Sequence, residues 1–169
     1  AEVTLVSGPV QIAPPLCVRL IPVVTAADMA SAVKECYQEQ DIIIKTAAVA
    51  DYRPAHPADE KVKKKDDKPV MELERTEDIL AYLGAHRKDG QFICGFSMET
   101  ENMLENSRAK LARKNVDMIV ANNLKVAGAG FGTDTNVVTI ITKDDCKQLE
   151  LMSKSEVAAS IVSEILQKM

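Results

Sequence analysis

The sequence lacks any long apolar run, and this argues against a membrane-spanning protein. A membrane helix needs about 18 or more consecutive apolar residues, and no stretch of this chain approaches that length. No signal peptide precedes the first apolar segment, so we predict a cytoplasmic protein. An excess of positive charge is missing too. The net charge is −4 with both signs interspersed, which argues against a dedicated nucleic-acid binder.

The cysteines and histidines form no pattern typical of a metal or disulfide site. No Cys-x-x-Cys pair occurs, and the two histidines lie far apart in hydrophilic stretches. We therefore predict reduced, structural thiols and no zinc site. The residues concerned are Cys17, Cys36, Cys94, Cys146, His56 and His86.

The familiar glycine and nucleophile motifs are also missing. The chain has no Gly-x-Gly-x-x-Gly, no Gly-x-x-x-x-Gly-Lys-Ser/Thr and no Gly-x-Ser-x-Gly. The one glycine-rich stretch, residues 127–132, precedes an expected strand and not a helix. It is therefore a weak signal for phosphate binding.

The chain does have the size and patterning of one globular α/β domain. Its 169 residues are 46% apolar and 27% charged, enough for one core and too few for two. Expected strands alternate with helices until two strands follow one another near the end, which favours a mainly parallel sheet with an antiparallel edge. Capping boxes begin the helices after Thr25 and Ser153, and Thr76 is expected to cap the helix that ends near residue 86. The expected strands cover residues 1–7, 16–23, 42–49, 91–97, 117–121, 136–142 and 148–151, and the third of them should be buried on both faces. The expected helices run over about 25–38, 76–86, 100–114 and 153–168.

Three expected strand ends carry residues suited to a ligand. In an open parallel sheet, ligands bind at the carboxyl ends of the strands. The first end has small residues after Lys45 and then Asp51, the second has Phe96 before a helix N-terminus, and the third is the stretch 121–123. These features fit a nucleotide with Phe96 near its base. The alternative, that small residues only let helices pack on strands, stays open.

A lysine cluster comes after the first of these strand ends. Residues 61–65 could pair with residues 70–74 as a charged hairpin that projects as a flap. Such a cluster is usually a solvated turn, but it could also close over a triphosphate and stabilise its charge. Lys110 and Lys114 share one helix face. They either complement the helix dipole or contact phosphates. The cluster comprises Lys61, Lys63, Lys64 and Lys65.

Taken together, several stretches resemble one family. AAVADYRPA, EKVKKK, TEDIL, GFSMET, RAKLARKN, DMIVANN and GFGTDTN occur in order over the chain. They are similar to the phosphopantothenate–cysteine ligase domain, often the C-terminal half of a bifunctional flavoprotein of coenzyme A synthesis. The resemblance implies a Rossmann-like three-layer fold and a single nucleotide-binding ligase domain over residues 1–169, with a flap at about 59–74.

The resemblance also implies an activity. Such a ligase joins 4′-phosphopantothenate to L-cysteine through an acyl-cytidylate, using CTP more often than ATP, with Mg²⁺, and releasing CMP and pyrophosphate. Family members are homodimers in which the neighbouring subunit partly covers the pocket. A fused phosphopantothenoylcysteine decarboxylase domain would add FMN. Partners would otherwise be small molecules, with no nucleic acid and no membrane.

Site residues are implied by the resemblance, motif by motif. Lys61 would be the catalytic flap lysine, and Asp51 would help to hold the nucleotide. Glu77 replaces a residue that is commonly proline, so its side chain is a weaker candidate. The remaining nucleotide-binding positions would be Lys45, Thr46, Ala47, Ala48, Asp78, Ile79, Leu80, Phe96, Lys110 and Lys114.

One departure from the family pattern affects these expectations. Family members begin with a βα unit whose asparagine supports the acyl-nucleotide, and residues 1–9 of this chain match the strand that comes after that unit. We therefore expect the first βα unit to be absent from this chain, and the chain alone to be inactive. Two alternatives to a ligase remain: a Rossmann-like oxidoreductase, whose glycine motif would lie in that unit, and a non-catalytic nucleotide-binding module.

Overall fold

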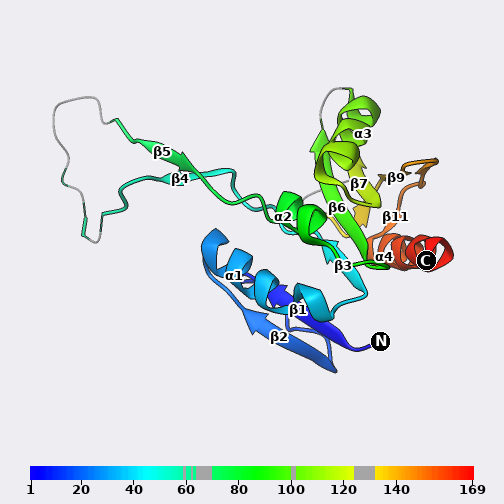
Figure 1. Cartoon of the computed structure of the whole chain (residues 1–169), viewed down its shortest axis with the longest axis horizontal. Coiled ribbons are helices and arrows are strands. Elements are labelled where there is room, and N and C mark those ends of the chain that lie inside the picture. The colour runs from blue at the N-terminus through cyan, green and yellow to red at the C-terminus, as the bar shows by residue number, and fades with distance from the viewer. Residues whose placement is uncertain (59, 62, 64–69, 100–101, 124–131) are drawn as a thin grey trace. The chain divides into compact units, whose positions relative to one another are not determined.

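The computed structural model describes residues 1–58, 60–61, 63, 70–99, 102–123 and 132–169, which form two compact units (Figure 1). The first unit comprises Ala1–Glu35 and Ala48–Asp78, and the second comprises Cys36–Ala47 and Ile79–Met169. No helix in the described ranges is long and apolar enough to cross a membrane.

The second unit is built on a five-stranded sheet of order β10-β9-β7-β6-β3. Strands β3, β6 and β7 run parallel, whereas β9 and β10 are antiparallel to their neighbours. A small antiparallel pair, β8 with β11, lies outside this sheet. The expected α/β class, mainly parallel sheet and antiparallel edge are thus confirmed. The elements are η1 (Tyr37–Glu39), β3 (Ile42–Lys45), α2 (Ile79–His86), β6 (Phe92–Glu99), α3 (Met103–Lys114), β7 (Met118–Asn123), β8 (Thr135–Asn136), β9 (Val138–Thr142), β10 (Cys146–Gln148), β11 (Met152–Ser153) and α4 (Lys154–Lys168).

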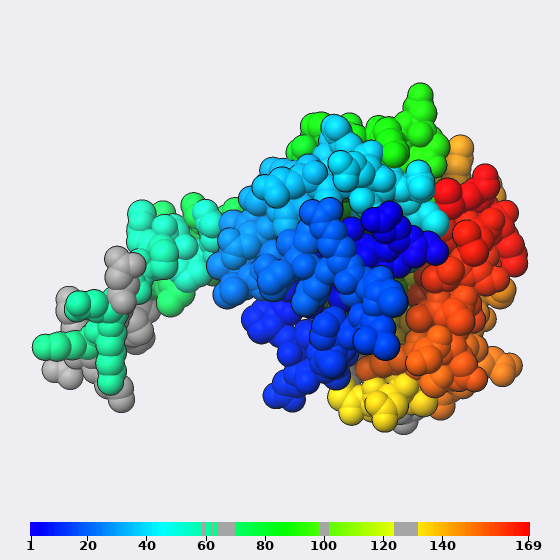
Figure 2. Space-filling model, turned by 90° about the horizontal axis from the view of Figure 1, so that it is seen from below, coloured from blue at the N-terminus to red at the C-terminus, as the bar shows by residue number. Residues whose placement is uncertain are grey.

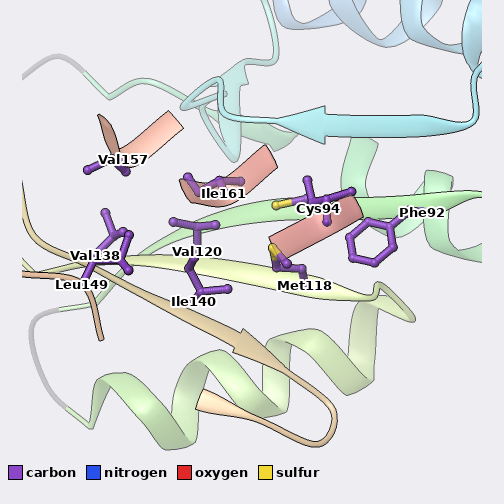
Figure 3. Packing of buried hydrophobic residues seen from close by; sticks show 10 residues of the cluster. Phe92, Cys94, Met118, Val120, Val138, Ile140, Leu149, Val157 and Ile161 are labelled. Atoms are coloured by element: carbon purple, nitrogen blue, oxygen red, sulfur yellow. The ribbon is translucent and has the colours of Figure 1, made fainter. Parts of the chain in front are cut away.

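The core of this unit lies between the sheet and α4 (Figure 3). Strand β7 contributes side chains to both faces, because its first four residues are all buried, as expected for a parallel strand covered on both sides. The other side of α4 is exposed, and the helix is open to view in red in Figure 2. The core cluster comprises Phe92, Cys94, Met118, Val120, Val138, Ile140, Leu149, Val157, Ile161 and Ile165.

Side-chain hydrogen bonds fix the start of helix α4 and the starts of strands β6 and β7. Helix α4 begins with the predicted capping box: Glu156 N–H donates to Ser153 Oγ (3.2 Å), and Ser153 N–H donates to the Glu156 carboxylate (2.8 Å). At the amino end of the parallel strands, Asp117 accepts hydrogen bonds from Ile93 N–H (2.7 Å) and from Arg87 (2.9 Å). These bonds join the start of β6 to the start of β7 and so fix their register.

Gly84 lets α2 and α3 approach closely. A Cβ at this position would lie 1.7 Å from the backbone oxygen of Lys114. We expect Gly84→Ala to destabilise the protein despite the better helix propensity of alanine, because overpacking costs about 1–3 kcal/mol or more. The melting temperature should fall by about 5–10 °C, measured by thermal denaturation. Gly8→Ala, whose Cβ would meet nothing within 4 Å, is the control and should leave it unchanged. A stable Gly84→Ala protein would contradict this account of the α2–α3 contact.

The first unit contains a parallel strand pair, one helix and a hairpin. Strand β1 (Val3–Ser7) pairs with β2 (Val18–Pro22), and β4 (Tyr52–Pro54) pairs antiparallel with β5 (Leu73–Arg75). Helix α1 (Ala26–Cys36) begins with the predicted Thr25–Asp28 capping box, whose two backbone bonds measure 2.9 and 3.1 Å. Hydrogen bonds to the Asp28 carboxylate from the backbone and the side chain of Thr25 lower the pKa of Asp28, so the cap persists until the carboxylate is protonated below its ordinary range.

Several expected boundaries are wrong. The strand expected over residues 42–49 ends at Lys45, and its Ile44 is 40% exposed. It is therefore not buried on both faces, since β3 is an edge strand of its sheet. Thr76 does not cap α2; its hydroxyl donates to the Ala50 carbonyl instead, and the helix starts at Ile79. Of the strand expected over 148–151, only residue 148 lies in a strand, at the end of β10, and β11 begins after residue 151.

The hairpin strands also lie elsewhere than expected. Residues 61 and 63 are outside any strand, and the pairing joins Tyr52 to Arg75 and Pro54 to Leu73. Residues 59, 62 and 64–69 of the expected flap lie outside the described part of the chain, as do Thr100 at the expected helix start and most of the glycine-rich stretch.

Candidate functional site

The second unit brings four of the predicted site residues to one region of its sheet. Lys45 of β3 is the register partner of Gly95 in β6. Leu80, at the start of α2, packs over Gly95, where a Cβ would lie 2.5 Å from Leu80 Cδ2. Next along β6, the Phe96 carbonyl accepts a hydrogen bond of 3.1 Å from Lys110 Nζ. These contacts lie at the middle of β6, and parallel sheets bind ligands beyond the carboxyl ends of their strands.

Gly95 makes this arrangement possible, although it was not among the predicted site residues. A side chain there would clash with the Leu80 side chain and force it to move. The available signal was a glycine inside an apolar strand, which often marks a close approach of another group.

Phe96 lies differently from the expectation of a ring beside a base. Its side chain is half-buried and packs against the core cluster, on the face of β6 that also carries Phe92 and Cys94. It is therefore the carbonyl of Phe96, and not its ring, that meets Lys110. A contact between the ring and a base stays a prediction.

The residues after β3 lie outside any helix or strand. Lys45 Nζ donates to the Ala47 carbonyl at 2.9 Å, so the ammonium group contacts the segment that comes after its own strand. Thr46 and Ala47 are exposed. Their backbone groups are thus accessible to a ligand, in keeping with the predicted role of this strand end.

Lys110 and Lys114 lie on the same face of α3, four residues apart. Both are half-buried, and the backbone oxygen of Lys114 lies at the α2–α3 contact beside Gly84. Lys114 is thus at the C-terminal end of the helix, where a positive charge also complements the helix dipole. Lys110 lies one turn earlier, and its ammonium group has three N–H donors, of which Phe96 accepts one.

In the first unit, the base of the hairpin carries Asp51 and Glu77. Thr76 N–H donates to the Asp51 carbonyl at 3.0 Å, which leaves the exposed Asp51 side chain at the entry to β4. Glu77 forms an ion pair of 2.5 Å with Lys34 of α1. This pairing gives Glu77 a structural role and agrees with its standing as a weaker candidate for nucleotide binding.

The remaining predicted residues are divided between the units. Ala48 and Asp78 belong to the first unit, whereas Ile79 begins α2 in the second. Lys61 is exposed on the segment between β4 and β5, and no hydrogen bond or ion pair among the described residues joins it to Asp51. The catalytic role of Lys61 therefore stays a prediction.

Two polar pairs near the strand ends were not predicted. Ser97 of β6 and Ser107 of α3 share a hydrogen bond of 2.9 Å, with both side chains buried. Asn136 Nδ2 donates to Asn122 Oδ1 at 2.9 Å and so joins the end of β7 to β8. Asn122 was expected at a strand end, but its partner lies 14 residues away, beyond the reach of any local pattern.

Cys94 is unsuited to nucleophilic chemistry. Burial, with a smaller contribution from the charge of Asp117, raises the pKa of the Cys94 thiol to about 12. The thiol is therefore neutral at ordinary pH, and a neutral thiol is a poor nucleophile. This agrees with its predicted structural role. The described residues include no group of three or more His, Cys, Asp or Glu side chains placed to hold a metal ion.

Comparison with known proteins identifies relatives for the whole chain. The family model described as "DNA/pantothenate metabolism flavoprotein C-terminal domain" matches residues 1–169. The coenzyme A biosynthesis bifunctional protein CoaBC of Bacillus subtilis (strain 168) is 50% identical over 98% of this chain and 41% of its own length. A protein named cysteine/cysteine sulfinic acid decarboxylase, from an unknown prokaryotic organism, is 47% identical over 98% of this chain and 47% of its own length. The chain thus spans less than half the length of these relatives.

A solved structure has the same fold. The crystal structure of the C-terminal domain of CoaBC superimposes with a TM-score of 0.82 at 46% identity, covering 99% of this chain and 76% of that one. The DNA/pantothenate metabolism flavoprotein from Streptococcus pneumoniae gives 0.81 at 18% identity, over 99% of this chain and 82% of that one, and so shares the fold.

Proposed function

Because the chain belongs to the family described as the DNA/pantothenate metabolism flavoprotein C-terminal domain, we propose that it joins 4′-phosphopantothenate to L-cysteine in coenzyme A biosynthesis. The observation that carries this proposal is the 50% identity to CoaBC over nearly the whole chain. The TM-score of 0.82 to the C-terminal domain of CoaBC supports it. The proximity of Lys45, Leu80 and Lys110 to Gly95 and Phe96 supports a nucleotide site in this part of the sheet.

The proposed reaction has two steps. The carboxylate of phosphopantothenate attacks the α-phosphate of CTP, forming an acyl-cytidylate and releasing pyrophosphate. The amine of cysteine then attacks the acyl carbon, CMP leaves, and the amine loses a proton as the amide forms. Both steps move negative charge onto phosphate oxygens, and this is the charge that positioned lysines stabilise.

Some residues of this chain would bind the nucleotide, and one would act in the chemical step. The Lys110 ammonium group has two N–H donors beyond the one given to Phe96, and these suit phosphate oxygens. The exposed backbone at residues 46–47 can approach the nucleotide. Lys61, on the segment between the hairpin strands, would stabilise the pyrophosphate as it leaves.

Magnesium is implied by the family, and the donor chemistry of the chain fits it. Mg²⁺ takes one or two carboxylates and fills its other positions with phosphate oxygens and water. The exposed Asp51 carboxylate, at the entry to β4, is such a group. When bound, the ion would neutralise part of the triphosphate charge. The protein's own contribution there is to hold Asp51 in place through the Thr76–Asp51 backbone bond.

A single assay of the full-length protein tests this function. The protein is incubated with CTP or ATP, phosphopantothenate and cysteine, and pyrophosphate is measured. We expect release that depends on both phosphopantothenate and nucleotide, and that is faster with CTP. Hydride transfer would favour an oxidoreductase, and nucleotide binding without turnover a regulatory module. Nucleotide-independent release of CO₂ from cysteine would favour the activity named for the decarboxylase relative.

Assembly and location are further parts of this proposal. We expect a homodimer, a cytoplasmic location and a fused FMN-containing decarboxylase domain, as CoaBC is named bifunctional. The hairpin offers apolar surface for self-association, since Tyr52 is 51% and Leu73 54% exposed. Sedimentation of the full-length protein would test the dimer: a Tyr52→Ser, Leu73→Ser variant that dimerises as tightly as wild type would exclude this surface.

A further inference from the structure

Helix α3 carries the two lysines proposed to bind phosphate, yet it has little apolar surface in the core. Ser107 is its one fully buried residue among those described. Apolar packing is not directional, and a helix with so few buried apolar side chains has little to fix its rotation and height against the sheet. Polar contacts to β6 therefore add to the constraint that the α2–α3 contact at Gly84 supplies at the end of the helix.

Two such contacts join α3 to consecutive residues of β6. Ser107 bonds Ser97 through the hydroxyl groups at 2.9 Å, and Lys110 donates to the Phe96 carbonyl at 3.1 Å. Ser107 and Lys110 are three residues apart and therefore on one helix face. Two contacts one turn apart fix both the position of the helix and its rotation, whereas a single contact would leave the helix free to rotate about it.

The serine pair is suited to this task. Ser97 is 3% and Ser107 0% exposed, so water does not compete for their hydrogen bond. Ser97 also pairs with Ala121 in the ladder between β6 and β7, on a strand that has a neighbour on each side in the sheet. The pair therefore holds α3 at a fixed place against β6.

We propose that the Ser97–Ser107 hydroxyl pair is a positioning element that holds α3 so that the Lys110 ammonium group meets the nucleotide phosphates. This inference rests on the proposed nucleotide-dependent function. The serines touch no substrate, and they act through Lys110. Their loss should weaken nucleotide binding and leave the chemical step largely intact.

The test separates positioning from stability with single and double variants of the full-length protein. Ser97→Ala leaves Ser107 buried without its partner and should lower both the melting temperature and the affinity for CTP. The double variant Ser97→Ala, Ser107→Ala replaces both hydroxyls with apolar groups, which is nearly neutral for stability. We expect its melting temperature to recover while its dissociation constant for CTP, measured by calorimetry, stays raised by about fivefold. Recovery of both quantities would show that the pair only packs, and would overturn the proposal.

Two further measurements make the outcome specific. In a Lys110→Ala background, Ser97→Ala should change the CTP dissociation constant by less than about twofold, because the residue it acts through is gone. An undiminished effect there would contradict the proposal. Thr142→Val is the matched control. It removes a buried hydroxyl of β9 at the position that pairs with Met118, the first residue of β7. This variant should lower the melting temperature without changing the dissociation constant for CTP.

Failure of this inference differs from failure of the proposed function. If the wild-type protein neither binds CTP nor releases pyrophosphate, the ligase proposal fails, and the serine pair then has no nucleotide to position. If the wild type binds CTP, Lys110→Ala weakens that binding and the double serine variant does not, the serine inference alone fails.

Discussion

Replacing Lys61 by glutamine is expected to cut the turnover number of the full-length protein by about a hundredfold or more, the effect of losing one preorganised charge donor. The dissociation constant for CTP should change far less, because the lysine acts on charge that develops as pyrophosphate departs and cysteine attacks. Initial rates of pyrophosphate release, together with calorimetric binding of CTP, measure the two effects separately.

The hairpin supplies the physical basis for this expectation. Its ends are held together by the Ala55–Glu72 and Thr76–Asp51 backbone bonds, of 2.9 and 3.0 Å, and an Arg53–Glu74 ion pair joins the two strands. Lys61 comes after this paired segment. Prolines at positions 54 and 57 restrict the chain that leads to it and so limit the entropy lost when the lysine closes on the nucleotide.

Lys63 gives a matched control for Lys61. It is exposed, carries the same charge and lies two residues further on. Lys63→Gln should have a mild effect on both turnover and CTP binding, and so should Lys64→Gln. If Lys61→Gln and Lys63→Gln had equal and small effects, the lysine cluster would be a charged surface without a catalytic member.

Local signals in the sequence predicted two helix starts well. The Thr25–Asp28 and Ser153–Glu156 boxes depend on residues three apart, and both form as expected. A capping box can be predicted because its donors and acceptors are neighbours in the sequence.

Distant contacts set the features that the sequence did not predict. Thr76 looked like a helix cap, but its hydroxyl bonds Ala50, 26 residues away. Glu77 was the weaker candidate for nucleotide binding, and the sequence did not predict that its carboxylate pairs with Lys34, 43 residues earlier. The exposure of Ile44 follows from the place of β3 at the sheet edge, which no local pattern encodes.

In the candidate site, too, the sequence predicted the residues but not the contacts between distant elements. Lys45, Leu80, Phe96 and Lys110 were chosen by resemblance, and the structure brings them together in one unit. The atoms that make the contacts were not predictable: the Phe96 carbonyl, the missing side chain of Gly95 and the serine pair are all features of how α2 and α3 pack on β6.

Lys110→Ala is expected to raise the Michaelis constant for CTP by tenfold or more, with a smaller effect on the turnover number. A charge-assisted hydrogen bond to phosphate contributes about 1.5–3 kcal/mol, which corresponds to that change. Lys114→Ala should act in the same direction. Its effect should be smaller, because its backbone lies at the end of α3 beside Gly84, whereas Lys110 is held at the Phe96 carbonyl, at the middle of β6.

Arg113 provides the control on the same helix. It is exposed and belongs to the same last turn of α3, so it contributes equally to dipole complementation. Arg113→Ala should therefore lower helix stability about as much as Lys114→Ala without changing the Michaelis constant for CTP. Wild-type nucleotide affinity in both lysine variants would mean that these lysines only complement the helix dipole, and the phosphates would then have to be bound by residues of the first unit.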